Sequence, residues 1–211
     1  MKQLLIVGAR GYGREVYNFA KECTGYGSDF AIKGFLDDKP DALEGFSNYP
    51  GIIGPVETYQ IGADDVFACA LGSVKHKRLY VEHIKARGGR FITLIHPAAT
   101  VYSNTKFGEG CIVSHYATIS CDVRVGDFVT FHSLCTVGHD ARIGNFCQLD
   151  AYTFMGGFAE LGDEVTLHTG AKVLPNKKVG AGATVGAGSV VVHNVKPGTT
   201  VFGMPAMPLN F

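Results

Sequence analysis

The most regular feature of the chain is a six-residue repeat of apolar positions between Ile95 and Lys196. Every sixth residue from Ile95 is apolar, and the residue four places after each of these is small or β-branched, except at Lys177. A period of six matches neither the helical repeat of about 3.6 residues nor the simple alternation of a strand. Six-residue repeats instead build a parallel β-helix, in which three hexads close one triangular coil.

This register predicts which residues fill the coil. The large and the small residue of each hexad point inward, whereas a series of ordinary sandwich strands would have irregular loops that break the register. Several large residues are directly followed by glycine, and we expect these glycines at the tight corners. They are Gly108, Gly126, Gly138, Gly144, Gly156, Gly162, Gly180 and Gly186.

The first ninety residues follow a different pattern, so we expect two domains, 1–90 and 91–211. An apolar strand from Lys2 to Gly8 leads into a glycine-rich turn and an amphipathic helix, which is the first half of a Rossmann-like α/β unit. Further strands are predicted at 31–36 and 66–71, and a helix at 74–87. Their carboxyl ends should open onto one crevice, where open parallel sheets bind ligands.

Several residues of this crevice are candidates for nucleotide binding. Gly8, Gly11 and Gly13 form GxxGxG instead of the dinucleotide pattern GxGxxG, which favours a mononucleotide or nucleotide sugar, although a turn needed only for packing is the alternative.

Two further groups belong to the same crevice. Asp37 and Asp38 end the second strand, where carboxylates can accept hydrogen bonds from a ribose or a base. Gly72 ends the third strand. Lys77, in the first turn of the next helix, either meets a phosphate or is solvated.

Composition and charge serve mainly to exclude classes of partner and of targeting segment. The chain has 19 basic and 19 acidic residues, so nothing in its net charge argues for a nucleic-acid partner. No apolar run approaches the roughly 20 residues of a membrane span, and the N-terminus does not resemble a signal peptide. Cys111, Cys135 and Cys147 fall on small inward positions, so we expect free core thiols in a reducing cytoplasm, with a disulfide framework or a catalytic thiol as alternatives.

Chemistry in the repeats must come from outward residues at the corners, and histidine is the most informative type. His139 follows Val137 and Gly138 and precedes Asp140, whose carboxylate can orient the imidazole and raise its basicity. This pair is the minimum for a general base, although a surface histidine beside a surface aspartate is the alternative. Gly157 lies one coil of 18 residues later, where its backbone can approach a ligand closely.

A second group is the column of His132, Asp150 and His168, each 18 residues from the next. Residues at this spacing stack at about 4.8 Å per coil. A hydrogen-bonded surface ladder is the simplest interpretation, and a substrate-orienting or metal-binding group is the alternative. No third nitrogen ligand is evident in the sequence.

Taken together, these motifs are similar to those of a known family. The chain resembles the nucleotide-sugar acetyltransferases of the hexapeptide-repeat superfamily, which have a left-handed β-helix and include sialic acid O-acetyltransferase-like proteins and UDP-4-amino-sugar N-acetyltransferases. The segments that carry the resemblance are LLIVGARGYGREV, FLDD, ALGSVKHK, LIHPAATV, VGHDARIG and VFGMPAMPL.

The resemblance implies a cytoplasmic homotrimer that transfers an acetyl group from acetyl-CoA to an amino or hydroxyl group of a sugar or nucleotide sugar in bacterial surface-glycan synthesis. It implies His139 as general base, Asp140 as its orienting partner, and the Gly157 N–H as donor to the acetyl oxygen. Residues near Ala187 and Gly188 would hold distal CoA. The residues expected to hold the nucleotide are Gly11, Gly13, Asp37, Asp38, Gly72 and Lys77.

The chain departs from the family pattern at three places. Gln148 stands where related amino-sugar enzymes often carry a second histidine, so a role in substrate binding remains while proton transfer at neutral pH is excluded. His132 and Ser133 replace an Asn-Thr pair, and Arg10 replaces a common glycine. Two other functions remain open: a nucleotide-sugar-binding module without turnover, and a metalloenzyme of the γ-carbonic anhydrase kind, which needs three histidine ligands.

Overall fold

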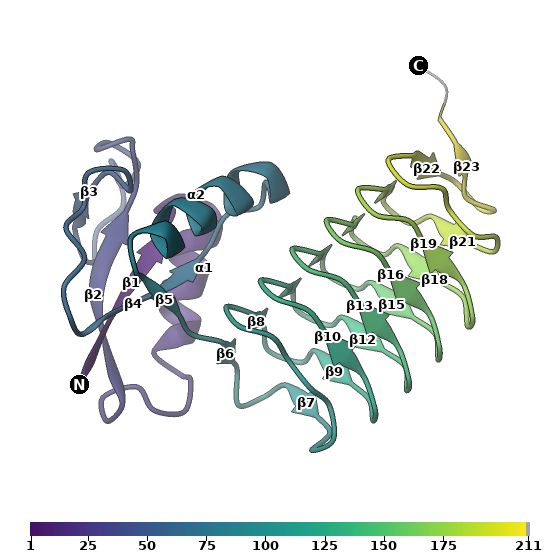
Figure 1. Ribbon diagram of the computed structural model, residues 1–211, viewed down its shortest axis with the longest axis horizontal. Helices are drawn as coiled ribbons and strands as arrows, with labels where there is room; N and C mark the ends of the chain where they lie inside the picture. The colour runs from purple at the N-terminus through teal and green to yellow at the C-terminus, as the bar shows by residue number, and fades with distance from the viewer. Residues whose placement is uncertain (210–211) are drawn as a thin grey trace. The chain divides into compact units, whose positions relative to one another are not determined.

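A computed structural model describes residues 1–209 and divides the chain into two compact units, Met1–His96 and the part from Pro97 onward (Figure 1). The boundary falls at His96 instead of the predicted residue 90. The first unit extends this far because β5 (Arg90–Phe91) pairs with its sheet, and because His96 Nε2 lies 2.9 Å from Glu22 Oε2 and stacks on Phe19.

The first unit is a five-stranded parallel sheet in the order β3-β2-β1-β4-β5, and two helices follow its strands in the Rossmann-like manner (Figure 1). Strands β1, β2 and β4 match the predicted strands closely, because their apolar runs are buried in the sheet. The remaining bounds are α1 (Gly11–Ala20), α2 (Val74–Ala86), β1 (Lys2–Val7), β2 (Phe30–Leu36), β3 (Ile52–Gly54), β4 (Asp65–Cys69) and β6 (Leu94–Ile95).

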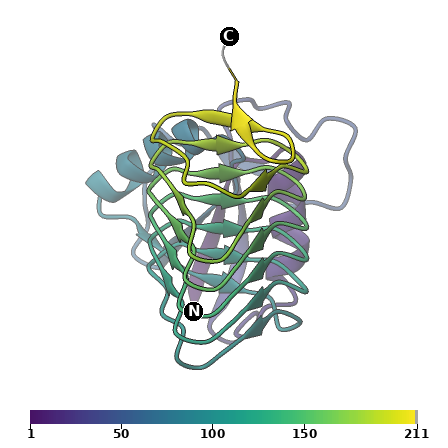
Figure 2. The same ribbon diagram turned by 90° about the vertical axis from the view of Figure 1, so that its right-hand side faces the viewer.

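The second unit is a parallel β-helix whose coils stack one above the other, from teal to yellow in Figure 2. From β7 to β21 each strand pairs in parallel with a strand 18 residues away, for example Thr136 with Phe154, so the sequence register is the structural register. Three faces result.

The first face contains β8 (Ile112–Val113), β11 (Thr130–Phe131), β14 (Gln148–Leu149), β17 (Thr166–Leu167), β20 (Thr184–Val185) and β22 (Thr200–Phe202), and β23 (Met207–Pro208) pairs antiparallel with β22. The second face contains β7 (Thr100–Val101), β9 (Thr118–Ile119), β12 (Thr136–Val137), β15 (Phe154–Met155), β18 (Lys172–Val173) and β21 (Val190–Val191). The third face contains β10 (Arg124–Val125), β13 (Arg142–Ile143), β16 (Glu160–Leu161) and β19 (Lys178–Val179).

The core of the β-helix consists of the predicted large and small positions. Phe131, Leu149 and Leu167 are fully buried, and so are the small residues Cys111 and Cys147. All six cysteines are free, and burial raises the pKa of Cys135 to about 11, so this thiol is a core residue and not a nucleophile.

The prediction that glycines after the large residues make the corners is wrong. Every sixth residue from Gly110 to Gly188 has a positive φ, and this residue lies two places after the expected glycine, as at Asp140 with φ of 59°. The glycines serve close packing instead: a Cβ on Gly126 would lie 2.8 Å from the carbonyl carbon of Gly144 in the next coil. Asp140 itself therefore adopts the left-handed backbone conformation, which aspartate tolerates better than most residues.

Candidate active site

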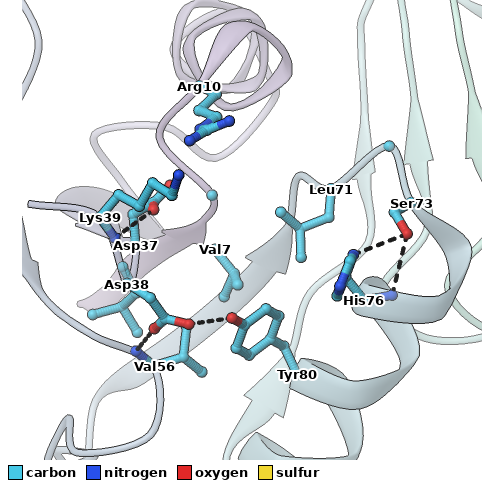
Figure 3. A pocket seen from close by; sticks show the side chains of 13 residues that line it. Val7, Arg10, Asp37, Asp38, Lys39, Val56, Leu71, Ser73, His76 and Tyr80 are labelled. Atoms are coloured by element: carbon cyan, nitrogen blue, oxygen red, sulfur yellow. Dashed lines mark hydrogen bonds between the residues drawn. The ribbon is translucent and has the colours of Figure 1, made fainter. Parts of the chain in front are cut away.

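A pocket of about 350 Å³ lies at the carboxyl ends of β1, β2 and β4, as the sequence predicted (Figure 3). The predicted Asp37, Asp38 and Gly72 line it, and Arg10 enters from the start of α1. The other lining residues are Val7, Gly8, Leu36, Lys39, Val56, Leu71, Ser73, His76 and Tyr80.

Both aspartates are held by hydrogen bonds that shape the pocket wall. Asp37 accepts from the N–H of Ala9 at 2.8 Å and from the N–H of Lys39 at 2.9 Å, which ties the β1–α1 turn to the end of β2. Asp38 accepts from the N–H of Val56 at 3.1 Å and from the Tyr80 hydroxyl (Figure 3). Each oxygen keeps a second lone pair, so both carboxylates can still accept from a ligand.

Helix α2 contributes residues that sequence reasoning missed. Its N-cap Ser73 accepts from the N–H of His76. The Ser73 hydroxyl also lies 3.1 Å from His76 Nδ1, so Nε2 is the ring nitrogen that does not face Ser73 (Figure 3). The hydrogen bond to Asp38 and burial raise the pKa of Tyr80 to about 12, so its hydroxyl remains a donor. The sequence does contain a signal for these residues, because Ser73, His76 and Tyr80 follow Gly72 at the spacing of one helix face.

Three predicted nucleotide-binding residues do not line this pocket. A Cβ on Gly13 would overlap the carbonyl oxygen of Gly8, so this glycine permits close packing of α1 on β1, the alternative considered for the motif. Gly11 lies in the first turn of α1 outside the pocket. Lys77 is only 1% exposed, and with Val81 and Ile84 it forms the buried stripe of α2, so the interpretation as a solvated lysine is wrong.

In the β-helix, the His139 corner follows the β9–β12–β15 face and contains Cys121, His139 and Gly157 in successive coils. His139 Nδ1 lies 2.8 Å from Asp140 Oδ2. A carboxylate only accepts, so Nδ1 carries the proton and Nε2 presents its lone pair. Both side chains are near half exposed, at 54% and 42%, and are accessible to a substrate.

The imidazole lies directly over Gly157. A Cβ on Gly157 would lie 2.8 Å from His139 Nε2, and the Phe158 ring meets the imidazole edge-on with centroids 5.3 Å apart. Among residues 1–209 the N–H of Gly157 has no hydrogen-bond acceptor. A basic nitrogen and a free backbone donor are therefore adjacent, as acyl transfer requires.

A pocket of about 440 Å³ adjoins this corner on the β10–β13–β16 face. It is lined by Asp140 and Phe158 together with Asp122, Arg124, Arg142 and Glu160. Asp122 accepts from Asn104 and Glu160 pairs with Lys178 at 2.9 Å, so the carboxylates of this wall are already partnered. The pocket provides space beside the His139–Asp140 pair on the outside of the coil.

The Asn145 corner, which follows the β10–β13–β16 face, has the opposite chemistry. Here the N–H of Glu109 donates to Asp127, that of Asp127 to Asn145, and that of Asn145 to Asp163, at distances between 2.7 and 2.9 Å. Each backbone donor is occupied by a side chain from the next coil. These three backbone donors are therefore not available to a ligand's acceptor group.

The column of His132, Asp150 and His168 lies at the third corner, as the spacing predicted. His168 Nδ1 is 3.0 Å from Asp150 Oδ2, while His132 Nε2 is 3.9 Å from Asp150 Oδ1. No group of three His, Cys, Asp or Glu side chains in the described part of the chain is arranged to hold a metal ion. Ala187 and Gly188 are exposed at this same third corner, so a single chain does not bring them together with His139.

Both the first unit and the β-helix have counterparts in known proteins. Residues 3–84 match the model of the PglD N-terminal domain. Over 134 residues the chain is 32% identical to a GDP-perosamine N-acetyltransferase of Escherichia coli O157:H7, an alignment that covers 58% of this chain and 56% of the relative. The chain thus spans about half the length of the curated relatives it matches.

The solved structures cover nearly the whole chain. The acetyltransferase domain of PglB from Neisseria gonorrhoeae is 31% identical, with a TM-score of 0.90 over 99% of this chain and 100% of that domain, and it has also been solved with acetyl coenzyme A. PerB from Caulobacter crescentus, solved with CoA and GDP-perosamine, has a TM-score of 0.89 at 24% identity and covers 100% of this chain and 98% of its own, which supports the fold alone. No helix within residues 1–209 is long and apolar enough to cross a membrane. The match to the gonococcal domain over its full length places the chain in the hexapeptide-repeat family of sugar acetyltransferases, which combine a PglD-type N-terminal domain with a left-handed β-helix.

Proposed function

We propose that this chain is an acetyl-CoA-dependent N-acetyltransferase that acts on the amino group of a nucleotide-linked sugar. The observation that carries the proposal is the orientation of His139, whose Nδ1 is held by Asp140 at 2.8 Å and whose Nε2 lies over Gly157. The relative named above as a GDP-perosamine N-acetyltransferase favours nitrogen over oxygen as the acceptor atom.

The proposed reaction uses this geometry. His139 Nε2 accepts a proton from the sugar amine as the amine nitrogen attacks the thioester carbonyl carbon, and a C–N bond forms. The Gly157 N–H stabilises the negative oxygen of the tetrahedral intermediate. The C–S bond then breaks, and the imidazolium returns its proton to the CoA sulfur. Asp140 stabilises the imidazolium and keeps Nε2 directed at the substrate.

The nucleotide binds in the pocket of the first unit. Its apolar wall suits a base, and Asp37 and Asp38 retain lone pairs for the ribose hydroxyls. The turn at Gly72, together with Arg10 and His76, provides donors for the diphosphate. Gln148 is a further substrate contact.

Acetyl-CoA requires residues from more than one corner of the β-helix. Gly157 lies at the His139 corner, while Ala187 and Gly188, expected near distal CoA, lie at the third corner. A single CoA molecule contacts both sets only where two copies of the chain meet. Together with the family resemblance, which implies three subunits, this supports a homotrimer with its active sites between subunits as the proposed assembly.

The proposed setting is the cytoplasm of a bacterium that builds surface glycans. All six cysteines are free thiols, which is typical of a reducing compartment. Both substrates, acetyl-CoA and a nucleotide sugar, are made there.

The test is to incubate the purified protein with acetyl-CoA and a panel of GDP-linked and UDP-linked 4-amino sugars that includes GDP-perosamine. We expect release of free CoA and a mass gain of one acetyl group on one amino sugar, and no reaction with the matching 4-hydroxy sugar. Tight nucleotide binding without CoA release from any member would overturn the proposal and favour a binding module.

A further inference from the structure

Gln148 occupies an unusual place on the outside of the β-helix. It is the outward residue of β14, in register with Thr130 and Thr166 on the neighbouring strands, yet it is only 8% exposed. The outward residues of the other two faces in the same part of the β-helix include the exposed Arg142 and Lys172. A long polar side chain that is buried here needs partners for both ends of its amide.

Its neighbour Asp150 determines which way the amide points. Gln148 Nε2 donates to Asp150 Oδ1 at 3.0 Å, and the other carboxylate oxygen lies 3.0 Å from His168 Nδ1. Because a carboxylate only accepts hydrogen bonds, the NH₂ end must face Asp150 and the oxygen must face away. The orientation of the amide is therefore set by the carboxylate of Asp150, which can only accept.

The result is a buried acceptor without a donor. Gln148 Oε1 has no hydrogen-bond partner among residues 1–209. Buried polar atoms are nearly always satisfied, and an acceptor that stays empty destabilises the free protein. Proteins break this rule mainly at functional sites, where a ligand can supply the missing donor.

We propose that Gln148 reads a hydrogen-bond donor on a substrate, and that Asp150 and His168 are positioning residues that keep Oε1 directed at it. This inference rests on the proposed acetyl transfer and names the chemistry that this position selects. The matching group carries N–H or O–H, as an amino sugar or the pantetheine amides of CoA do. The ionised diphosphates of both substrates only accept, so they are excluded from this position.

The first test replaces Gln148 by methionine, which has a similar length and no polar atoms. We expect KM to rise about 10- to 100-fold for one substrate, because its donor is left unpaired, while kcat changes less than 3-fold. A rise for the amino sugar alone identifies the sugar as the source of the donor, and a rise for acetyl-CoA alone identifies pantetheine. Thr166→Val, one coil away on the same face, is the matched control with unchanged constants. Unchanged KM values in Gln148→Met would overturn the inference.

The positioning residues are tested by variants that keep or remove one hydrogen bond. Asp150→Asn offers the amide both a donor and an acceptor, so Gln148 is no longer held in one orientation, and the same KM should rise several-fold. His168→Phe should act in the same direction, and His168→Asn, which can still donate to Asp150, should restore the wild-type value. A loss of kcat with both KM values unchanged would contradict a positioning role.

A third readout does not depend on turnover. Without substrates, the melting temperature of Gln148→Met should equal or exceed that of the wild type, because the variant removes the unpaired acceptor. A fall of several degrees would mark Gln148 as structural and overturn the inference. If the wild type acetylates no member of the panel, the proposed function fails, and this thermal comparison still decides whether Gln148 is a structural residue.

Discussion

The His139 corner and the Asn145 corner have the same backbone path but opposite hydrogen bonding. At the Asn145 corner the backbone N–H groups donate to Asp127, Asn145 and Asp163 of the next coil. At the His139 corner the equivalent residue after Gly157 is Pro175, whose side chain offers no acceptor, and the Gly157 N–H is left without a partner among residues 1–209. Satisfied donors hold the coils together, whereas a free donor beside a basic nitrogen can bind a reacting group.

Removing the base at the His139 corner should have the largest effect. We expect His139→Ala to lower kcat about 10²- to 10⁴-fold, the range for a general base, because no other group accepts the amine proton. Acetyl-CoA binding, measured by calorimetry, should stay within about 2-fold, since the CoA contacts expected at Gly157, Ala187 and Gly188 remain in place. Wild-type turnover in this variant would show that the two corners do not differ in function.

Filling the space above Gly157 should have the next largest effect. A Cβ in Gly157→Ala would lie 2.8 Å from His139 Nε2 and push the imidazole aside, and a displacement of about 1 Å can lower the rate about 10²-fold. The measurement is kcat together with the melting temperature. A normal rate would mean that the ring does not work from its position over Gly157.

In the first unit, the carboxylate of Asp65 also accepts a hydrogen bond from a backbone N–H, as Asp163 does at the Asn145 corner. It is 3% exposed and accepts from Gly62 N–H at 2.7 Å, Lys33 at 2.8 Å and the Tyr59 hydroxyl at 2.7 Å. Burial opposes its ionisation, but these hydrogen bonds outweigh burial and hold the pKa of Asp65 below its ordinary value. We expect Asp65→Asn to lower the free energy of unfolding by about 1 to 3 kcal/mol near neutral pH.

The pH dependence of this effect has a definite sign. A carboxyl whose pKa is lower in the folded state stabilises the fold above its unfolded pKa of about 4 and loses this contribution as pH falls through its folded pKa. The difference between wild type and Asp65→Asn in urea unfolding should therefore shrink below about pH 4. A difference that grows with acid would contradict the role of Asp65.

Breaking the ladder at the Asn145 corner should have the smallest effect. Asp163→Ala removes the acceptor of the Asn145 N–H at 2.7 Å, and at this exposed position we expect a loss of about 0.5 to 1.5 kcal/mol in unfolding free energy. The value of kcat should be unchanged. A large loss of activity would show that this corner also takes part in catalysis.

The spacing of residues predicted a large part of the fold and of the His139 site. The repeat placed Val137 and Leu149 in the core and put His139 and Gly157 one coil apart, because a solenoid converts a sequence interval directly into a distance. Apolar strand runs likewise located Asp37, Asp38 and Gly72 at the rim of the pocket in the first unit. In both cases local periodicity was sufficient.

Contacts between distant segments were beyond the reach of the sequence. Lys77 is buried by the packing of α2, Gly13 by the approach of α1 to β1, and Tyr80 meets an aspartate 42 residues earlier in the chain. None of these follows from residue type or spacing within one element. Propensity describes a residue's own segment, but burial depends on what the rest of the chain places against it.

The sequence by itself therefore determined the two architectures, the strand register of the β-helix, and the pairing of His139 with Asp140 on a corner. Only the tertiary structure decided that the imidazole lies over Gly157, and that within residues 1–209 the Gly157 N–H has no acceptor and the buried Gln148 Oε1 has no donor. The reason is physical. A period sets where a residue sits along a coil, while hydrogen-bond satisfaction depends on the exact side chain that the next coil presents.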